Sequence, residues 1–207
     1  MNGKFVTLEG CEGVGKSTQL RFLREYLETE GIPAVFTREP GGTPLAERIR
    51  ELLLDDSLTI SAEAEAELFA TQRRDHIDNF ILPALDAGKL VVCDRYIDSS
   101  LAYQGFGRGL GLERVLALNE YAVKTCMPVL TVFIDMDPTV SFRRQKGKII
   151  EHDRIETESK EFHLNCYRGY KEIERLYPAR FKAVVPEEDK RMTHMKIVAA
   201  LKSGGAI

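Results

Sequence analysis

The chain has 207 residues, of which 43% are hydrophobic and 29% are charged, and this composition is ordinary for a soluble globular protein. Its length suits one domain with a substantial core and a small lid. A net charge of −3 argues against a general nucleic-acid binder, which usually carries a basic excess. No apolar run approaches the roughly 18 residues of a transmembrane helix, and the first residues lack the long apolar stretch of a secretory signal.

The four cysteines indicate reduced thiols. Cys11, Cys93, Cys126 and Cys166 are widely spaced and form no C-x-x-C pair. A disulfide framework or a structural metal site is therefore not expected. We expect a cytoplasmic protein with neither a nucleic acid nor a membrane as its partner.

Short apolar or β-branched runs alternate with longer segments of helical period. In chain order, the pattern predicts a strand at 5–9, a helix at 17–29, a strand at 34–37, helices at 45–54 and 62–85, a strand at 90–93, a helix at 112–125, a strand at 129–134, a helix that begins after Asp137-Pro138, a helix at 159–177, a strand at 181–185 and a helix at 189–202.

This alternation predicts an α/β fold of three layers, α/β/α, around a five-stranded parallel sheet. In such sheets, ligands bind outside the carboxyl ends of the strands. Residues 145–153 have no apolar period and are expected to form a mobile loop. With no repeat and no long linker, residues 1–207 are expected to form one domain.

A phosphate-binding loop follows the first expected strand. Residues 10–17 match G-x-x-x-x-G-K-[ST] between a strand and a helix, which is the context that the motif requires. Its glycines let backbone N–H groups surround phosphates, Lys16 can reach the β- and γ-phosphates, and the Ser17 hydroxyl can ligate Mg²⁺. The predicted ATP-binding residues are Gly10, Cys11, Glu12, Gly13, Val14, Gly15, Lys16, Ser17 and Thr18.

Three arginines suggest a second anionic ligand beside this loop. Arg38 and Arg95 follow the second and third expected strands, and Arg73 lies one helical turn after Phe69. The planar guanidinium suits a phosphate or the edge of a base, and Phe69 offers an apolar surface for a base. Taken singly, each arginine is better explained as a solvated surface charge, but their joint placement favours a binding site.

Several segments together resemble the thymidylate kinase family in its bacterial form. They span roughly residues 5–178, and their order and spacing are more specific than any one of them. The matching segments are Glu9-Gly10-Cys11-Glu12-Gly13-Val14-Gly15-Lys16-Ser17, Arg38-Glu39-Pro40-Gly41-Gly42-Thr43, Leu68-Phe69 with Arg73, Asp94-Arg95-Tyr96, Ala102-Tyr103-Gln104-Gly105, Asp153-Arg154-Ile155-Glu156 and Gly169-Tyr170.

The resemblance implies transfer of the γ-phosphoryl group of ATP to dTMP, giving dTDP and ADP, in deoxynucleotide biosynthesis. It implies that Phe69 stacks on thymine, that Arg73 contacts the edge of the base, and that Arg38 and Arg95 hold the acceptor phosphate. Tyr103 would pack against the deoxyribose. The implied substrate-binding residues are Glu12, Arg38, Phe69, Arg73, Arg95, Ser99, Ser100, Tyr103, Gln104 and Tyr170.

The resemblance also implies Mg²⁺, held near Ser17 and Asp94, a lid at about residues 143–155, and a homodimer packed through helices. Because phosphoryl transfer needs alignment and charge neutralisation, positive groups should meet between the two nucleotides. The implied catalytic residues are Lys16, Arg95, Arg38, Arg143 and Arg144, of which the last two belong to the lid. The adenine contacts are left unassigned because residues 184–189 depart from the family pattern.

Other readings remain open at this point. A GTPase switch would need N-K-x-D and D-x-x-G motifs, and neither is present. A nucleoside kinase would need a carboxylate to activate a hydroxyl, whereas the paired arginines favour a phosphorylated acceptor. A catalytically silent nucleotide-binding protein is disfavoured by Lys16, Ser17, Asp94 and Arg95. Selectivity for dTMP over dUMP does not follow from the sequence.

Overall fold

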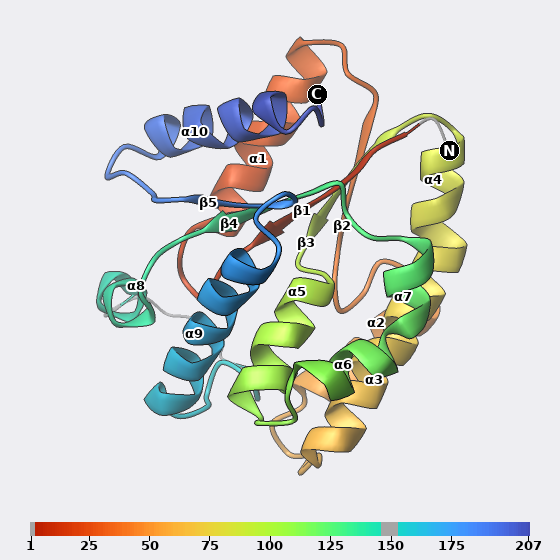
Figure 1. Cartoon of the computed structure of the whole chain (residues 1–207), viewed down its shortest axis with the longest axis vertical. Helices are drawn as coiled ribbons and strands as arrows, with labels where there is room; N and C mark the ends of the chain where they lie inside the picture. The colour runs from red at the N-terminus through yellow and green to blue at the C-terminus, as the bar shows by residue number, and fades with distance from the viewer. Residues whose placement is uncertain (1–2, 146–152) are drawn as a thin grey trace.

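The computed structural model describes residues 3–145 and 153–207. Of the expected lid at 143–155, residues 146–152 therefore lie outside the described residues. The described chain forms a five-stranded parallel sheet in the order β2-β3-β1-β4-β5, with helices on both faces (Figure 1). The strands are β1 (Phe5–Glu9), β2 (Ala34–Arg38), β3 (Leu90–Asp94), β4 (Leu130–Ile134) and β5 (Phe181–Val184).

The centre of the sheet holds the hydrophobic core. Every residue of β1 and β4 is buried, whereas the edge strand β2 is only partly buried. Val6 pairs with Val92 on one side and with Leu130 on the other. Both faces of these central strands are covered, which explains their near-continuous apolar sequences.

The helices differ from the expected ones mainly because two expected helices, at 62–85 and 112–125, are divided into shorter segments. The helical segments are α1 (Lys16–Thr29), α2 (Pro44–Leu54), α3 (Ala62–His76), the π-helical turn η1 (Ile77–Ile81), α4 (Leu82–Asp86), α5 (Ile97–Ser100), the π-helical segment η2 (Leu101–Gly107), α6 (Leu112–Leu118), α7 (Glu120–Thr125), α8 (Pro138–Gln145), α9 (Lys160–Leu176) and α10 (Lys190–Ser203). Figure 1 shows α1 and α10 over one face of the sheet, with α5 and α9 over the other.

Side-chain caps set the start of several helices. Thr43, Ser61 and Ser159 each accept a hydrogen bond from the backbone N–H three residues later, at the start of α2, α3 and α9. Such a cap satisfies one of the free N–H groups of the first turn and contributes about 1 kcal/mol.

The helical region at residues 97–107 was not predicted. Three of its polar side chains, Ser99, Ser100 and Gln104, line a cavity instead of facing water, so the segment lacks an amphipathic period. Helix α9 packs closely on it at Gly169, where a Cβ atom would lie 2.9 Å from the Phe106 ring. Glycine is therefore needed for this close approach.

The order of the strands creates a crevice at the carboxyl ends of β1 and β3. The chain leaves β1 for an edge strand, β2, and returns through β3 before it crosses to β4. Parallel α/β sheets bind ligands at such a switch point. Within residues 3–145 and 153–207, no helix has both the length and the apolar character of a membrane span.

Candidate functional site

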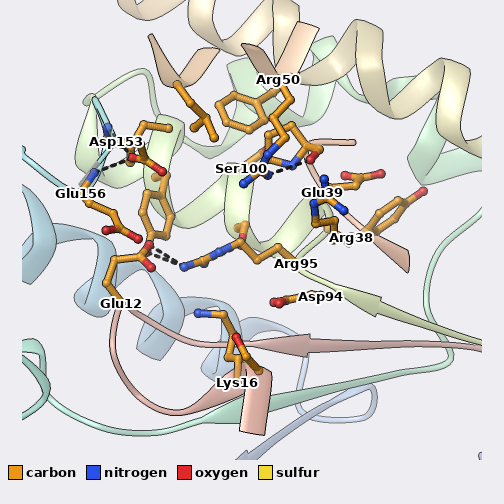
Figure 2. A pocket seen from close by; sticks show the side chains of 18 of the residues that line it. Glu12, Lys16, Arg38, Glu39, Arg50, Asp94, Arg95, Ser100, Asp153 and Glu156 are labelled. Carbon is orange, nitrogen blue, oxygen red and sulfur yellow. Dashed lines mark hydrogen bonds and ion pairs between the residues drawn. The ribbon is translucent and has the colours of Figure 1, made fainter. Parts of the chain in front are cut away.

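A cavity of about 500 Å³ opens at the carboxyl ends of the central strands, within the size range of small-ligand sites. Segments far apart in the sequence meet there, as Figure 2 shows. The predicted residues that line it are Glu12, Gly13, Gly15, Lys16, Ser17, Thr18, Arg38, Phe69, Arg73, Asp94, Arg95, Ser99, Ser100, Tyr103 and Gln104. The predicted residues outside its lining are Gly10, Cys11, Val14, Arg143, Arg144 and Tyr170.

The phosphate-binding loop connects β1 to α1. Its backbone adopts positive φ at Gly13 (72°) and Gly15 (102°), a region that glycine enters without steric cost. Lys16 Nζ donates to the carbonyl oxygens of Gly10 and Cys11, at 3.0 and 3.1 Å. Burial, reinforced by the charge of Arg95, lowers the pKa of Lys16. The loop thus holds its own lysine beside the place where phosphates would bind.

A cation after β3 contacts this loop. Arg95 Nη2 lies 2.5 Å from Glu12 Oε1, and the Tyr103 hydroxyl donates to the same oxygen at 2.9 Å. Burial opposes ionisation of Glu12, but the positive charges of Arg95 and Lys16 outweigh it and lower the pKa of Glu12 to about 2. The carboxylate is therefore ionised and paired at neutral pH.

The backbone of Arg95 is strained. Among the described residues it is the only non-glycine residue with positive φ, at 67°. A left-handed conformation at such a residue costs on the order of 1–3 kcal/mol and is concentrated at functional sites. The backbone N–H of Arg95 donates to Leu8 O at 3.0 Å, so the strand ends hold the turn that aims its side chain.

Behind Arg95 lies a buried carboxylate that sequence reasoning missed. Glu9 accepts hydrogen bonds from Tyr96 N at 2.8 Å, Ser99 Oγ at 2.6 Å and Tyr170 Oη at 2.9 Å. Burial, followed by the nearby charge of Asp98, raises the pKa of Glu9 to about 7. The available signal was its position as a charged residue at the end of an apolar strand.

Tyr170 does not line the cavity, and its expected approach to the nucleotide from α9 stays a prediction. Its side chain is fully buried, and its ring stacks on Phe133 with centroids 4.7 Å apart. Arg95 Nη1 donates to its hydroxyl at 3.3 Å. Because α9 packs on the core, the Tyr170 ring is buried there. Its hydroxyl reaches the site through hydrogen bonds with Arg95 and Glu9.

The wall formed by α3 carries Phe69 and Arg73. Arg73 is only 1% exposed, which excludes the reading as a solvated surface charge. Its Nε donates to Glu39 Oε2 at 2.7 Å, its Nη1 to Asn119 Oδ1 at 2.5 Å, and its Nη2 to Ser100 Oγ at 3.1 Å. A buried guanidinium that is held from three sides and still lines a cavity is suited to bind a polar ligand edge.

Arg38 lies at the end of β2 and lines the same cavity, but its side chain remains half exposed. Its Nη2 pairs with Glu47 Oε2 at 2.8 Å. Next to it, Arg50 of α2 also lines the cavity and donates to Pro40 O at 2.9 Å. Burial, then the charge of Arg38, lowers the pKa of Arg50. Sequence reasoning missed Arg50 because the helical pattern marked only the apolar face of α2.

Glu65 is a second missed carboxylate, fully buried on α3 one turn before Phe69. It accepts hydrogen bonds from Gln104 Nε2 at 2.9 Å, Arg108 Nε at 3.0 Å and Arg154 Nη2 at 2.7 Å. Burial alone would raise the pKa of Glu65, but these donors lower it. Glu65 thus fixes the amide of Gln104 in the cavity wall. Its helical spacing from Phe69 and Arg73 was the signal in the sequence.

Two oxygen donors that could hold Mg²⁺ lie beside the phosphate-binding loop. Asp94 Oδ1 is buried and has no hydrogen-bond partner among the described residues, and Ser17 is the second residue of α1 and lines the same cavity. Across the described chain, no three acidic, histidine or cysteine side chains gather into a metal cluster. Mg²⁺ commonly binds through one or two protein ligands together with phosphates, so this donor set fits the ion.

The two predicted lid arginines lie at the end of α8. Both are exposed, and Arg143 Nε donates back to Thr139 O at 3.0 Å within its own helix. Neither lines the cavity. Their contact with a nucleotide stays a prediction.

The comparisons with known proteins all point to one family. A family model described as "Thymidylate kinase" matches residues 8–197. A thymidylate kinase of Caldanaerobacter subterraneus subsp. tengcongensis is 42% identical over 202 residues, which cover 98% of this chain and 96% of the relative. One of Symbiobacterium thermophilum is 46% identical over 181 residues, or 87% and 84% of the two chains. The crystal structure of thymidylate kinase from Ehrlichia chaffeensis superposes with a TM-score of 0.79 at 32% identity, covering 98% of this chain and 100% of that one.

Proposed function

The chain belongs to the thymidylate kinase family, whose members phosphorylate dTMP to dTDP with ATP, and we propose that the cavity described above carries out this transfer with the division of roles that follows. The observation that carries the proposal is the contact between Arg95 and Glu12. It joins the end of β3, where an acceptor phosphate would bind, to the loop that would hold ATP.

On the donor side, the backbone N–H groups of the loop and Lys16 bind the β- and γ-phosphates. When ATP binds, Lys16 exchanges its hydrogen bonds to the carbonyl oxygens of Gly10 and Cys11 for stronger, charge-assisted bonds to the phosphates. Ser17 and Asp94 would hold Mg²⁺, directly or through water, and the bound ion would supply positive charge next to the phosphates. The unpartnered Oδ1 of Asp94 supports this role.

On the acceptor side, Phe69 stacks on thymine and Arg73 binds an edge of the base. Ser100 and Gln104 line the pocket, and Tyr103 packs against the deoxyribose. Arg38 and Arg95 bind the phosphate, with Arg50 as a further cation next to Arg38. The support is the joint lining of one cavity by residues from β2, α2, α3, β3 and η2.

Transfer itself asks little covalent chemistry of the protein. An oxygen of dTMP phosphate is already a nucleophile, so the residues must align it with the γ-phosphorus and offset the charge of two anions. Arg95 suits this task because it lies between the two sites and stays charged: the ionised Glu12 raises the pKa of Arg95 against the effect of burial. We assign Arg143 and Arg144 to the donor phosphates, in a lid at about 143–155 within a single domain.

The proposal includes a homodimer in the cytoplasm. Leu45 and Leu52 lie seven residues apart on one face of α2, and each is about half exposed, which supports packing through helices. The four cysteines are free and buried, in keeping with a reducing compartment.

An acceptor panel tests the proposed site. Protein with Mg-ATP should release ADP fastest with dTMP, compared with dUMP, UMP, AMP and thymidine. Thymidine lacks the phosphate that Arg38 and Arg95 would bind, so it should be a poor acceptor. A preference for AMP or thymidine would overturn the assignment of the acceptor pocket.

A further inference from the structure

A buried histidine, His76, contacts the carboxylate of Glu39 that also holds the guanidinium of Arg73. We propose that His76 is a positioning residue for dTMP binding: it occupies one carboxylate oxygen of Glu39, so that Glu39 pairs with Arg73 through the other oxygen alone. The guanidinium of Arg73 thereby keeps the orientation in which its free Nη hydrogens serve the pocket. This inference rests on the role of Arg73 proposed above.

Three buried side chains form the arrangement. Arg73 Nε donates to Glu39 Oε2 at 2.7 Å, and His76 Nδ1 lies 2.9 Å from Glu39 Oε1. The side chains of Arg73, Glu39 and His76 are 1%, 2% and 0% exposed, so water does not compete for these oxygens. To donate to a carboxylate, Nδ1 must carry a proton. Each donor therefore holds its own oxygen of Glu39.

Without His76, the same carboxylate would have a better partner. Arginine and carboxylate groups prefer a bidentate pair with two parallel N–H···O bonds. A bidentate pair that includes Nε would use Nη2 as its second donor, because the N–H bonds of Nε and Nη2 are parallel. In the structure, Nη2 donates to Ser100 Oγ at 3.1 Å. An Oε1 atom released by His76 would turn to Nη2, displace Ser100 and close the fork on Glu39.

The present arrangement leaves donors for a ligand. A guanidinium has five N–H hydrogens. Among the described residues, Arg73 spends three of them, on Glu39, Asn119 and Ser100. The other two belong to Nη groups of a side chain that lines the cavity. A second bond to Glu39 would replace the bond to Ser100, so the number of free N–H groups would stay the same, but it would turn the guanidinium and change the direction of this donor edge.

The ring of His76 is fixed on its other side. Its Nε2 lies 2.7 Å from Thr37 Oγ1, a hydroxyl that can donate or accept. A Cβ atom on Gly42 would lie 2.5 Å from Nε2, so the backbone of the loop after β2 closes over the ring. His76 does not line the cavity, whereas Glu39 and Arg73 do. Its effect on a ligand must pass through Glu39.

A pair of nearly isosteric substitutions tests the proposal. In His76→Asn, an amide N–H remains near the position of Nδ1, whereas His76→Leu has almost the same shape and no donor. We expect His76→Leu to raise the dTMP Kd, measured by calorimetry, by about tenfold, or about 1.4 kcal/mol. His76→Asn should stay within about threefold of the native chain, and the KM for ATP should change less than about twofold in both. Equal losses in the two variants, equal losses for ATP and dTMP, or an unchanged dTMP Kd for His76→Leu would overturn the proposal.

Arg73→Gln separates this inference from the proposed function. If His76 acts through Arg73, adding His76→Leu to Arg73→Gln should not weaken dTMP further. Weaker dTMP binding in Arg73→Gln but not in His76→Leu would overturn the role of His76 alone. Unchanged binding in Arg73→Gln would overturn both. If His76→Leu does not fold, His76→Gln takes its place. The longer side chain of Gln would place its amide near Thr37 and away from Glu39, so the dTMP Kd should again rise by about tenfold.

Discussion

Arg95 and Glu12, 83 positions apart in the sequence, form an ion pair that joins the end of β3 to the phosphate-binding loop. The pair is mostly buried, with each side chain 16% exposed. An acceptor phosphate that binds Arg95 must share it with the Glu12 carboxylate or displace that carboxylate. If these two sites bind as proposed, the contact would link the state of the donor loop to occupation of the acceptor site.

We expect Lys16→Ala to abolish phosphoryl transfer and to leave dTMP binding measurable. Lys16 would neutralise the transferred group, but its hydrogen bonds lie within the loop and not in the wall formed by α3. ADP release reports turnover, and calorimetry reports dTMP affinity. Lys4→Ala, on an exposed lysine that bonds Gly205 O, is the control and should keep full activity. Retained turnover in Lys16→Ala would refute the role of the loop lysine.

Phe69→Ala should weaken dTMP binding by about 1–3 kcal/mol, the scale of stacking between an aromatic side chain and a base. The matched control is Phe22→Ala, because Phe22 lies on α1 beside Arg21 and outside the cavity lining. Calorimetric titration with dTMP measures both variants. An unchanged affinity in Phe69→Ala would remove this ring from the pocket.

Glu9 should make the protein less stable as the pH rises from 5 to 8. Its folded-state pKa is raised to about 7 from the ordinary 4.5, so the folded state holds a proton that the unfolded state has lost. This contribution to stability is present at low pH and declines as the pH passes through 7. Glu9→Gln mimics the protonated form and does not titrate. From pH 5 to pH 8, its free energy of unfolding should therefore rise by roughly 2–3 kcal/mol relative to that of the native chain.

Urea unfolding of the native chain and of Glu9→Gln at pH 5 and pH 8 measures this difference. Glu12 does not interfere, because its contribution to stability changes only in acid. With a pKa of about 2, that contribution is fully present above about pH 4.5 and is lost as the pH falls toward 2. The same pH dependence in both proteins would show that Glu9 is not the titrating group.

Gly169→Ala should destabilise the fold by about 1–3 kcal/mol, the usual cost of overpacking. The new Cβ atom would lie 2.9 Å from the Phe106 ring and 3.0 Å from the Cα atom of Ala102. Gly105→Ala is the control, because its nearest neighbours would lie at 3.7 Å. Thermal unfolding compares the two, and a control that loses as much stability as Gly169→Ala would contradict the steric explanation.

Much of the scaffold was predictable because its signals are local or periodic. The five strands are confirmed within one residue at each end, and the motif from Gly10 to Ser17 joins β1 to the first turn of α1. Residues 97–107 escaped prediction because their polar side chains face a cavity, which removes the amphipathic period. Such a segment looks like a loop until its neighbours are known.

The sequence by itself determined the family, the parallel sheet and the phosphate-binding motif, and it predicted the kinds of residue that would surround a second nucleotide. Only the tertiary structure decided which charges are buried and with what they pair. Glu9, Glu65 and His76 became visible as buried partners of the cavity-lining residues Ser99, Gln104 and Glu39, and the ring of Tyr170 lies in the core. Local patterns record propensity and periodicity, whereas a buried polar group is defined by partners that folding alone brings within hydrogen-bond distance.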